Sequence, residues 1–293
     1  MIVVFGSLNV DCLARVARLP RDGDTLLALD YAVAPGGKGA NQALAARRAG
    51  ADVHLFGAVG RDGHSVEATR LLREDGVALD GLVATEAPTG VAWINVDVAG
   101  ANAITVVAGA NALARADAVP DRLLGRGTTV LMQLEVPIRE VEALALRARS
   151  RGARVMLNAA PATALPPALV ATLDVLVVNE NEAALLAGAD GVDDWCAARE
   201  RDGCATFVTL GARGARTRID GAVRTLPAPS VDVDDTVGAG DAFTGALAAA
   251  LDRGAARQVA LREALAAGAL ACAAPGAQPA MPRRAAIAAL AGT

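Results

Sequence analysis

The chain has 293 residues and a formal net charge of −4; hydrophobic residues make up 53% of its composition and aromatic residues only 2%. This length fits one large domain or a domain with an appendage, and the core must be built from Ala, Val and Leu. The negative charge and the few aromatic rings argue against a nucleic-acid-binding protein, because such a protein needs cationic surfaces and rings for base stacking.

Short apolar runs with strand character alternate with amphipathic segments rich in Ala, Leu and Arg. In chain order the strand-like runs are 2–6, 52–60, 129–135, 154–160, 174–180 and 206–211. Helical patterns occupy 41–50, 141–152 and 181–189. This βα alternation predicts an α/β fold in which helices cover both faces of a mainly parallel central sheet.

Two segments, 9–35 and 88–108, break the alternation because their strand-like residues have no helix between them. Within the second segment, "VDVAGANAIT" predicts a hairpin with Gly100 and Asn102 at its turn. We expect the two segments to form a small antiparallel β lid, whose exposed strand edges favour pairing with a second lid and so predict a homodimer. The body that binds the substrates would comprise residues 1–8, 36–87 and 109–293.

Polar residues directly follow several of the apolar runs. They are Asn9 and Asp11, Glu135, Asn158, Asn179, and Thr209 with Gly211. Because ligands of open α/β sheets bind beyond the carboxyl ends of the strands, we expect these residues to converge on one crevice that binds a small molecule.

The segment "DDTVGAGDAFTGALAAAL" (234–251) places Gly238, Ala239 and Gly240 directly before a long run of helix formers. Small residues let backbone N–H groups face a ligand, and a helix N-terminus favours an anion such as phosphate. Asp241 stands at the start of this helix and fits two roles. It could be an N-cap, or it could be a general base that accepts a proton from a substrate hydroxyl beside a phosphoryl group.

Two familiar nucleotide-binding motifs are absent. A P-loop requires G-x-x-x-x-G-K-[ST], but Lys38 is followed by Gly39, which has no hydroxyl. A dinucleotide fingerprint requires G-x-G-x-x-G, and the last spacing in "GAGDAFTG" is too long for it.

The stretch "APGGKGANQ" (35–43) contains Lys38, the one lysine of a chain that otherwise uses arginine. An ammonium is a compact point charge, whereas a guanidinium is a wider planar fork. The flanking glycines let the backbone approach a ligand closely. The stretch therefore indicates a tight pocket that places one ammonium against oxygen atoms, in preference to a turn with a solvated lysine.

The cysteines and histidines indicate no further chemistry. Four cysteines are scattered without a C-x-x-C pair, which predicts reduced thiols, and two histidines make a His-based triad or a zinc site unexpected. The N-terminus lacks the basic region and apolar run of a signal peptide, and no uncharged span approaches about 20 residues. We therefore expect a cytoplasmic protein without a membrane partner.

Two long segments, "GGKGANQA" and "DDTVGAGDAFTGAL", resemble the two signatures of the PfkB carbohydrate kinases. The segments "GSLNVD", "TGVA", "AGANA", "LMQLE", "NAAPA", "VVNENEA", "VTLGARGA" and "GAQPAMP" resemble the ribokinase branch of that family in order and spacing, over nearly the whole chain. The resemblance implies a ribokinase-like three-layer α/β fold with a small β lid. It also implies phosphoryl transfer from ATP to the primary hydroxyl of a sugar, with D-ribose as the expected acceptor.

The resemblance also implies roles for individual residues. The sugar would be bound by Asn9, Asp11, Gly37, Lys38, Asn41 and Glu135, under apolar lid contacts from Ala92, Ile94 and Val106. Asp241 would be the general base, and the turn of Gly238, Ala239 and Gly240 would form an anion hole, chiefly through the Ala239 and Gly240 amides. The nucleotide would be bound by Asn179, Glu182, Thr209, Gly211, Gly214 and Gly240, with Glu182 near the accompanying Mg²⁺ and bound to it through water.

A monovalent cation, expected to be K⁺, is implied beside the anion hole. The matching positions are Asp235, Val237, Ala271, Ala274, Gly276 and Ala280. Ala280 lacks the side-chain oxygen often found at its position, so water would replace one ligand.

Two alternatives stay open on the sequence alone. One is a kinase of the same fold that acts on fructose, deoxyribose, another ketosugar or a nucleoside. The other is a catalytically silent sugar-binding regulator. The scarcity of aromatic residues weakens the nucleoside option, and the presence of Asp241 disfavours a silent binder, which needs no base.

Overall fold

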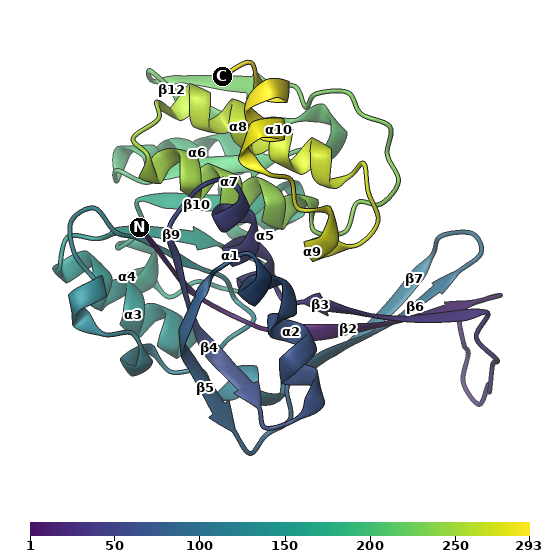
Figure 1. The fold of residues 1–293 in the computed structure, drawn as a ribbon. Coiled ribbons are helices and arrows are strands. Elements are labelled where there is room, and N and C mark those ends of the chain that lie inside the picture. The colour runs from purple at the N-terminus through teal and green to yellow at the C-terminus, as the bar shows by residue number, and fades with distance from the viewer.

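Runs of Val, Leu, Ile and Phe form a nine-stranded sheet through the centre of the computed structural model, which describes residues 1–293 (Figure 1). Its strands, in sheet order, are β13 (Ala222–Leu226), β12 (Ala215–Ile219), β11 (Ala205–Thr209), β10 (Val175–Asn179), β9 (Arg154–Asn158), β8 (Thr129–Met132), β1 (Ile2–Phe5), β4 (Val53–Gly60) and β5 (Ala78–Thr85). All neighbours from β11 to β5 pair in parallel, and only β12 and β13 pair antiparallel. The mainly parallel sheet confirms the prediction from the βα alternation.

Helices cover both faces of this sheet (Figure 1). One face carries α1 (Lys38–Arg48), α2 (Gly63–Glu74), α7 (Ala239–Asp252), α8 (Arg257–Ala271) and α10 (Arg284–Ala291), and the other carries α3 (Ile138–Ser150), α4 (Pro167–Val170), α5 (Glu180–Ala187) and α6 (Val192–Arg201). Because side chains alternate along a strand, Ile2 and Val4 enter the first core while Val3 and Phe5 enter the second. The three-layer architecture is therefore confirmed. A short helix, α9 (Ala277–Ala280), contacts both α1 and the lid strand β3.

A separate four-stranded sheet forms the lid and projects from the body (Figure 1). It contains, in sheet order, β3 (Asp30–Gly36), β2 (Asn9–Val16), β6 (Gly90–Asp97) and β7 (Asn102–Val107). Its two outer pairings are antiparallel, whereas β2 and β6 run parallel because both leave the body in the same direction.

The hairpin between β6 and β7 differs in one detail from the prediction. Gly100 lies in the turn with φ = 84°, but Asn102 is the first residue of β7 and pairs with Val96. The reason is the Asp97 carboxylate, which accepts the N–H groups of Ala99 and Ala101 and closes the turn before residue 102.

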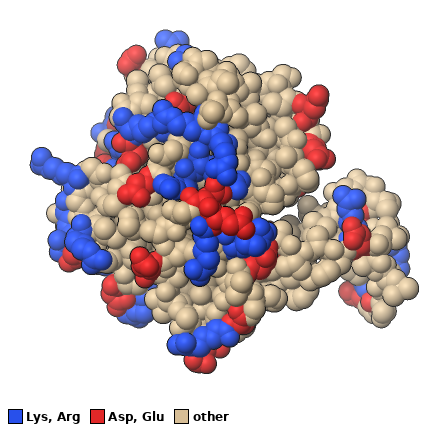
Figure 2. Space-filling model, in the orientation of Figure 1, with Lys and Arg blue, Asp and Glu red and all other residues tan.

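The register of the lid sorts its side chains onto two faces. Asp11, Ala92 and Val106 are paired across β2, β6 and β7, so they share one face, whereas Trp93 lies on the opposite face. Figure 2 shows basic and acidic side chains interspersed with uncharged surface on the projecting lid. Helices α2 and α9 contact only β2 and β3 of the lid. Both faces of the lid therefore leave large apolar side chains in contact with water: Ile104 is 54% exposed and Trp93 is 51% exposed.

No helix of the protein combines the length and the apolar character needed to cross a bilayer.

Candidate active site

A cavity of about 140 Å³ opens where the carboxyl ends of β9, β10 and β11 meet the N-terminus of α7. Its lining combines residues from distant parts of the chain: Lys38, Asn158, Ala160, Val177, Val178, Asn179, Glu182, Thr209, Gly238, Gly240, Asp241 and Thr244. The convergence of Asn158, Asn179 and Thr209 at the strand ends is as the sequence predicts.

The N-terminus of α7 presents unpaired N–H groups at this cavity. Gly238 is the N-cap and has φ = 79°, a left-handed conformation that favours glycine. The N–H groups of Gly240 and Asp241 donate to no protein atom, whereas the N–H of Ala239 donates to the Thr236 carbonyl at 3.3 Å. Ala239 is also absent from the cavity lining. The unpaired amides at the cavity are therefore those of Gly238, Gly240 and Asp241. A contact of the Ala239 amide with an anion stays a prediction.

Asp241 lies in the first turn of α7, so it is not the N-cap. Its side chain is buried, and α1 donates to both carboxylate oxygens: Asn41 Nδ2 lies 2.9 Å from Oδ2 and Gln42 Nε2 lies 2.8 Å from Oδ1. One helical turn further along the same face, a Cβ on Gly245 would lie 2.6 Å from the Ala45 Cβ and from the Gln42 carbonyl oxygen. Glycine at this position lets the two helices approach closely enough for these hydrogen bonds.

The start of α1 is capped by residues that are remote in sequence. The N–H groups of Lys38 and Gly39 donate to Glu135 Oε2 (3.0 Å) and Ser7 Oγ (3.3 Å), and the Ala40 N–H donates to the Ser7 carbonyl (2.9 Å). Ser7 Oγ in turn donates to Glu135 Oε2 at 2.5 Å. Because these partners satisfy the first-turn N–H groups, the helix begins at Lys38, three residues before the predicted start. Gly37, the N-cap with φ = 88°, turns the chain from the lid strand into this helix.

The base of the lid brings the predicted sugar-binding residues beside this site. Asn9 and Asp11 alternate along β2 and face the same side. A Cβ at position 36 would lie 2.4 Å from the Asp11 carboxylate oxygens, so glycine leaves the space that this side chain fills. Ala92 is buried beside Asp11, Ile94 is half-buried, and Val106 is 57% exposed on the same face further out.

Asn111, for which the sequence predicts no role, holds Leu8 and Asn9 in place, where the chain leaves the body and enters the lid strand β2. Its amide accepts from the Leu8 N–H (2.9 Å) and donates to the Leu8 carbonyl (3.1 Å) and to Asn9 Oδ1 (2.7 Å). The hydrogen bond from Asn111 occupies the side-chain oxygen Oδ1 of Asn9. Asn9 Nδ2 is then the side-chain group that can donate to a ligand.

Four carboxylates and one ammonium dominate the electrostatics. Burial, together with the charges of Glu135 and Asp241, raises the pKa of Asp11 to about 6. The charge of Asp241, supported by Glu135 and Glu182, raises the pKa of Lys38 despite its burial. Lys38 is therefore charged at neutral pH, and its side chain lies in the cavity with Asp241 and Glu182. Lys38 therefore lies near the N-terminus of α7 as well as beside the expected sugar.

The strand end of β10 contributes Asn179 and Glu182. Asn179 Oδ1 accepts from the Glu182 N–H (2.8 Å), and Glu182 Oε2 accepts from the Asn179 N–H (2.7 Å), so the two form a capping box at the start of α5. Burial raises the pKa of Glu182, and the Asn179 N–H and Lys38 oppose that effect. The capping box leaves Glu182 Oε1 free at the cavity.

The predicted nucleotide-binding residues beyond the cavity have different surroundings. Thr209 lines the cavity and Gly211 is exposed in the turn that follows β11. Gly214 is buried, and a Cβ there would lie 1.9 Å from the Leu226 carbonyl oxygen. Packing alone therefore explains a glycine at position 214, and its contact with a nucleotide stays a prediction.

The positions expected to bind a monovalent cation lie on two adjoining loops. Asp235 joins these loops, because its carboxylate accepts the N–H groups of Val237 (3.0 Å) and Gly276 (2.9 Å). Ala271 closes α8, and Ala280 closes α9. No group of three or more His, Cys, Asp and Glu side chains is arranged to hold a metal ion, so any cation here must rely largely on backbone carbonyls, water or substrate.

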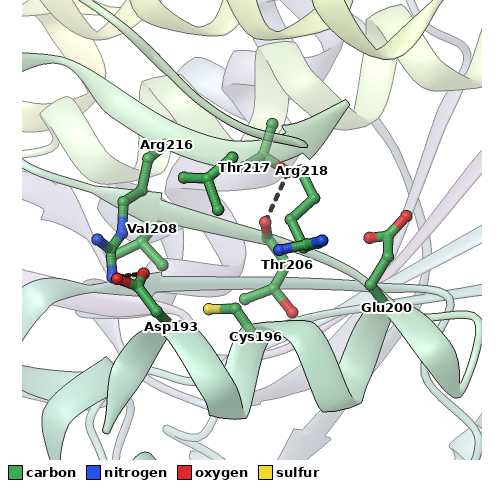
Figure 3. Close-up of a pocket in the computed structure, with 9 residues that line it drawn as sticks. Asp193, Cys196, Glu200, Thr206, Val208, Arg216, Thr217 and Arg218 are labelled. Carbon is green, nitrogen blue, oxygen red and sulfur yellow. Dashed lines mark hydrogen bonds and ion pairs between the residues drawn. The ribbon is translucent and has the colours of Figure 1, made fainter. Parts of the chain in front are cut away.

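A second, much smaller hollow lies between α6 and the strands β11 and β12 (Figure 3). Its volume is about 10 Å³, room for about one water molecule. Arg216 is ion-paired with Asp193 at 2.9 Å, and burial raises the pKa of the Cys196 thiol. Neutralised charges and a protonated thiol leave this hollow without evident chemistry.

Sequence reasoning missed the residues that hold the site residues in place: Ser7, Gln42, Asn111 and Gln133. Ser7 and Gln42 stand inside the quoted segments "GSLNVD" and "GGKGANQA". Their partners come from more than 90 residues away, at Glu135, Asp241 and Gln133.

The chain is similar in sequence and fold to known carbohydrate kinases. Residues 1–284 match the pfkB family carbohydrate kinase. The ribokinase of Haemophilus influenzae is 33% identical over 292 residues, which cover 97% of this chain and 95% of that protein. The ribokinase of Thermotoga maritima superposes with a TM-score of 0.91 at 29% identity, covering 100% of this chain and 99% of the other. The Arabidopsis thaliana ribokinase in complex with ribose and ATP superposes with a TM-score of 0.88 at 31% identity, covering 100% and 98%. The chain therefore belongs to the pfkB family of carbohydrate kinases.

Proposed function

We propose that the protein is an ATP-dependent kinase that transfers the γ-phosphoryl group of ATP to the O5 hydroxyl of D-ribose. One observation carries the proposal: Asp241 and Gly240, whose N–H groups are unpaired, line the same cavity as Lys38. The lid residues proposed for the sugar would lie beside this cavity. The similarity to ribokinases over the full chain supports ribose above fructose, deoxyribose or a nucleoside, and a silent regulator would not need this base.

The sugar would lie at the base of the lid. Its ring hydroxyls would donate to the Asp11 and Glu135 carboxylates and accept from the amide of Asn9, while Asn41 and Gly37 would border the hydroxyl that reacts. Ala92, Ile94 and Val106 would cover the sugar with apolar surface. Excluding water in this way limits wasteful hydrolysis of ATP.

Phosphoryl transfer then needs few covalent events. The O5 proton passes to the Asp241 carboxylate, O5 forms a bond to the γ-phosphorus, and the bond from that phosphorus to the β–γ bridging oxygen breaks, so ADP leaves with the electron pair. The amides of Gly240 and Asp241 would donate to the phosphoryl oxygens, where the helix N-terminus also favours negative charge. The positive charge of the Lys38 ammonium would reduce the repulsion between the Asp241 carboxylate and the phosphates.

ATP would lie along the strand ends of β10 and β11, with Asn179, Thr209 and Gly211 beside it. A bound Mg²⁺ would neutralise phosphate charge, and such ions usually keep several waters and few direct carboxylates. The free Glu182 Oε1 at the cavity fits this requirement, because one carboxylate oxygen can hold such an ion through water.

We also propose a monovalent cation at the loops joined by Asp235. The donor set would suit K⁺, since it would consist of the Asp235 carboxylate and of backbone carbonyls at Val237, Ala271, Ala274, Gly276 and Ala280. A bound cation would fix the loop that leads into Gly238 and so hold the α7 amides in place. Ala280 offers no side-chain oxygen, so water would complete the ligand set.

The lid suggests a homodimer, because a single sheet with apolar side chains on both faces is unstable in water without a partner. We further propose a cytoplasmic enzyme: all four cysteines are free, and ATP is available in that compartment.

The first prediction concerns the base. Purified protein should release ADP from ATP when D-ribose is present, and Asp241→Asn should lower kcat by about 10²- to 10⁴-fold because no group accepts the O5 proton. Ribose affinity, measured by calorimetry, should change little. The remote exposed variant Asp193→Asn serves as a charge-matched control with wild-type turnover. An Asp241→Asn enzyme within threefold of wild-type kcat would refute the assignment, and a panel of sugars and nucleosides would identify a different acceptor.

The second prediction concerns Asp11, whose pKa in the folded protein is about 6 instead of 3.8. The folded chain binds a proton that the unfolded chain has already released between these values, so the free energy of unfolding falls as pH rises from about 4 to 6. Asp11→Asn should therefore stabilise the ligand-free protein at pH 7.5 by about 1–3 kcal/mol while weakening ribose binding. Wild-type ribose affinity should fall below pH 6.

Thermal unfolding at pH 4.5 and 7.5, together with ribose titrations, would check both parts of this prediction. The exposed variant Glu86→Gln is the control and should leave stability and ribose affinity unchanged. A lower melting temperature for Asp11→Asn at pH 7.5 would contradict the prediction.

The third prediction concerns the cation. Replacing a large organic cation by K⁺ should raise kcat by about 5- to 100-fold and raise the melting temperature. Asp235→Ala should remove both effects, because it separates the two loops. Equal responses to K⁺ in the variant and the wild type would count against this site.

The fourth prediction concerns the lid. The wild-type protein should sediment as a dimer at micromolar concentration, and Ile104→Glu or Trp93→Glu, on opposite faces of the lid, should produce monomers by placing a charge in the interface. Val66→Glu, on the exposed side of α2, is the matched control and should remain dimeric. A monomeric wild type, or two dimeric lid variants, would exclude this mode of association.

A further inference from the structure

We propose that Gln42 is a positioning residue for the reaction: it aims the Asp241 carboxylate at the acceptor hydroxyl, and a buried row of amides fixes the direction of Gln42 itself. The inference rests on the proposed function, since it assumes that Asp241 is the base. It assigns a role to three side chains that the roles above leave out: Gln42, Gln133 and Asn158.

The row begins at the backbone carbonyl of Val177, which can act only as a hydrogen-bond acceptor. Asn158 Nδ2 donates to this carbonyl at 3.1 Å. Asn158 Oδ1 must therefore point the other way, toward Gln42, where it accepts from Nε2 at 2.9 Å. This requires the NH₂ group of Gln42 on that side, and the same nitrogen lies 2.8 Å from Asp241 Oδ1.

The hydrogen bond at Oε1 of Gln42 requires the same orientation of the amide. Its Oε1 accepts from Gln133 Nε2 at 2.7 Å. A flipped Gln42 amide would place its oxygen against two acceptors, Asn158 Oδ1 and Asp241 Oδ1, and its NH₂ group against a donor. The backbone of β10 thus determines, through two amides, that a donor faces the base.

The burial of Gln42 and Gln133 indicates that they position other side chains and do not bind a ligand themselves. Gln42 and Gln133 have no exposed surface, and neither lines the cavity. The row leaves Gln133 Oε1 buried without a partner, and Asn41 Oδ1, beside the row, is unpaired as well. An unpaired buried acceptor carries a free-energy cost, so a row that served only to satisfy its own polar groups would not end in one. Both unpaired oxygens follow from directing NH₂ groups toward Gln42 and Asp241.

The consequence for the reaction is geometric. Asn41 and Gln42 each occupy one lone pair, on different oxygens of Asp241, which fixes the plane of the carboxylate. The remaining lone pairs are then left in a fixed direction for the acceptor hydroxyl. A base must lie within hydrogen-bond reach of the proton that it takes, so losing this orientation should slow turnover more than it weakens binding.

A double-mutant cycle tests the inference with the full-length enzyme. Gln42→Met removes both hydrogen-bonding groups at similar volume. It should lower kcat by about 10- to 100-fold, the loss expected for a hydrogen bond to a charged group, while the KM values for ribose and ATP change less than about threefold. In the Asp241→Asn background, the same substitution should change the residual kcat less than about twofold, because Gln42 acts only through Asp241.

Matched variants complete the experiment. Gln133→Met removes the donor to Gln42 without touching Asp241 and should lower kcat by a smaller factor, with KM unchanged; it also tests the inference if Gln42→Met does not fold. Thr206→Val removes a buried hydroxyl without a partner, in the neighbouring strand β11 and outside the row, and should leave kcat unchanged.

Three outcomes would overturn the inference. They are a Gln42→Met enzyme with kcat within twofold of wild type, an equal loss of kcat in the wild-type and Asp241→Asn backgrounds, and a loss confined to KM. Failure of the proposed function would look different, since the wild type would then form no ADP with ribose or Asp241→Asn would be fully active.

Discussion

The contact between α1 and α7 is the constraint on which the site depends. Asn41 and Gln42 reach Asp241 across 200 and 199 residues of chain, and Gly245 allows the approach because any side chain there would meet the backbone of α1. The same two helices present the Lys38 ammonium and the unpaired Gly240 amide to the cavity. Positioning and charge compensation are what phosphoryl transfer requires of a protein, and one helix pair contributes to both.

Negative charge is concentrated where the sugar is expected. Asp11, Glu135 and Asp241 lie close enough for the latter two to raise the pKa of the first. Lys38 is the cation that faces Asp241, Glu135 and Glu182 together. The protein thus holds the ligand-free site in an unfavourable electrostatic state, which sugar hydroxyls can relieve by donating to the carboxylates. On the proposed function, ribose affinity and the stability of the ligand-free protein oppose each other at Asp11 for this reason.

The sequence predicts the layers, the lid segments and the strand-end crevice, because periodicity and polar residues after apolar runs are local signals. It also points to Lys38 and Asp241 through their glycine surroundings. It could not predict that α1 begins at Lys38, since the caps come from Ser7 and Glu135. The amide row is hidden for the same reason: Gln42, Gln133 and Asn158 have no shared spacing, and only the sheet brings them together. Asn102 was misplaced because the Asp97 side chain decides where the turn ends.

Reliance on arginine has a chemical consequence. The chain contains one side-chain primary amine, that of Lys38. Arginine does not react with common acylating reagents under mild conditions. Lys38 is therefore the one side chain that a reagent selective for amines can modify. Its raised pKa keeps it protonated and slows that reaction, and because Lys38 lines the cavity, a bound ligand should slow the reaction further.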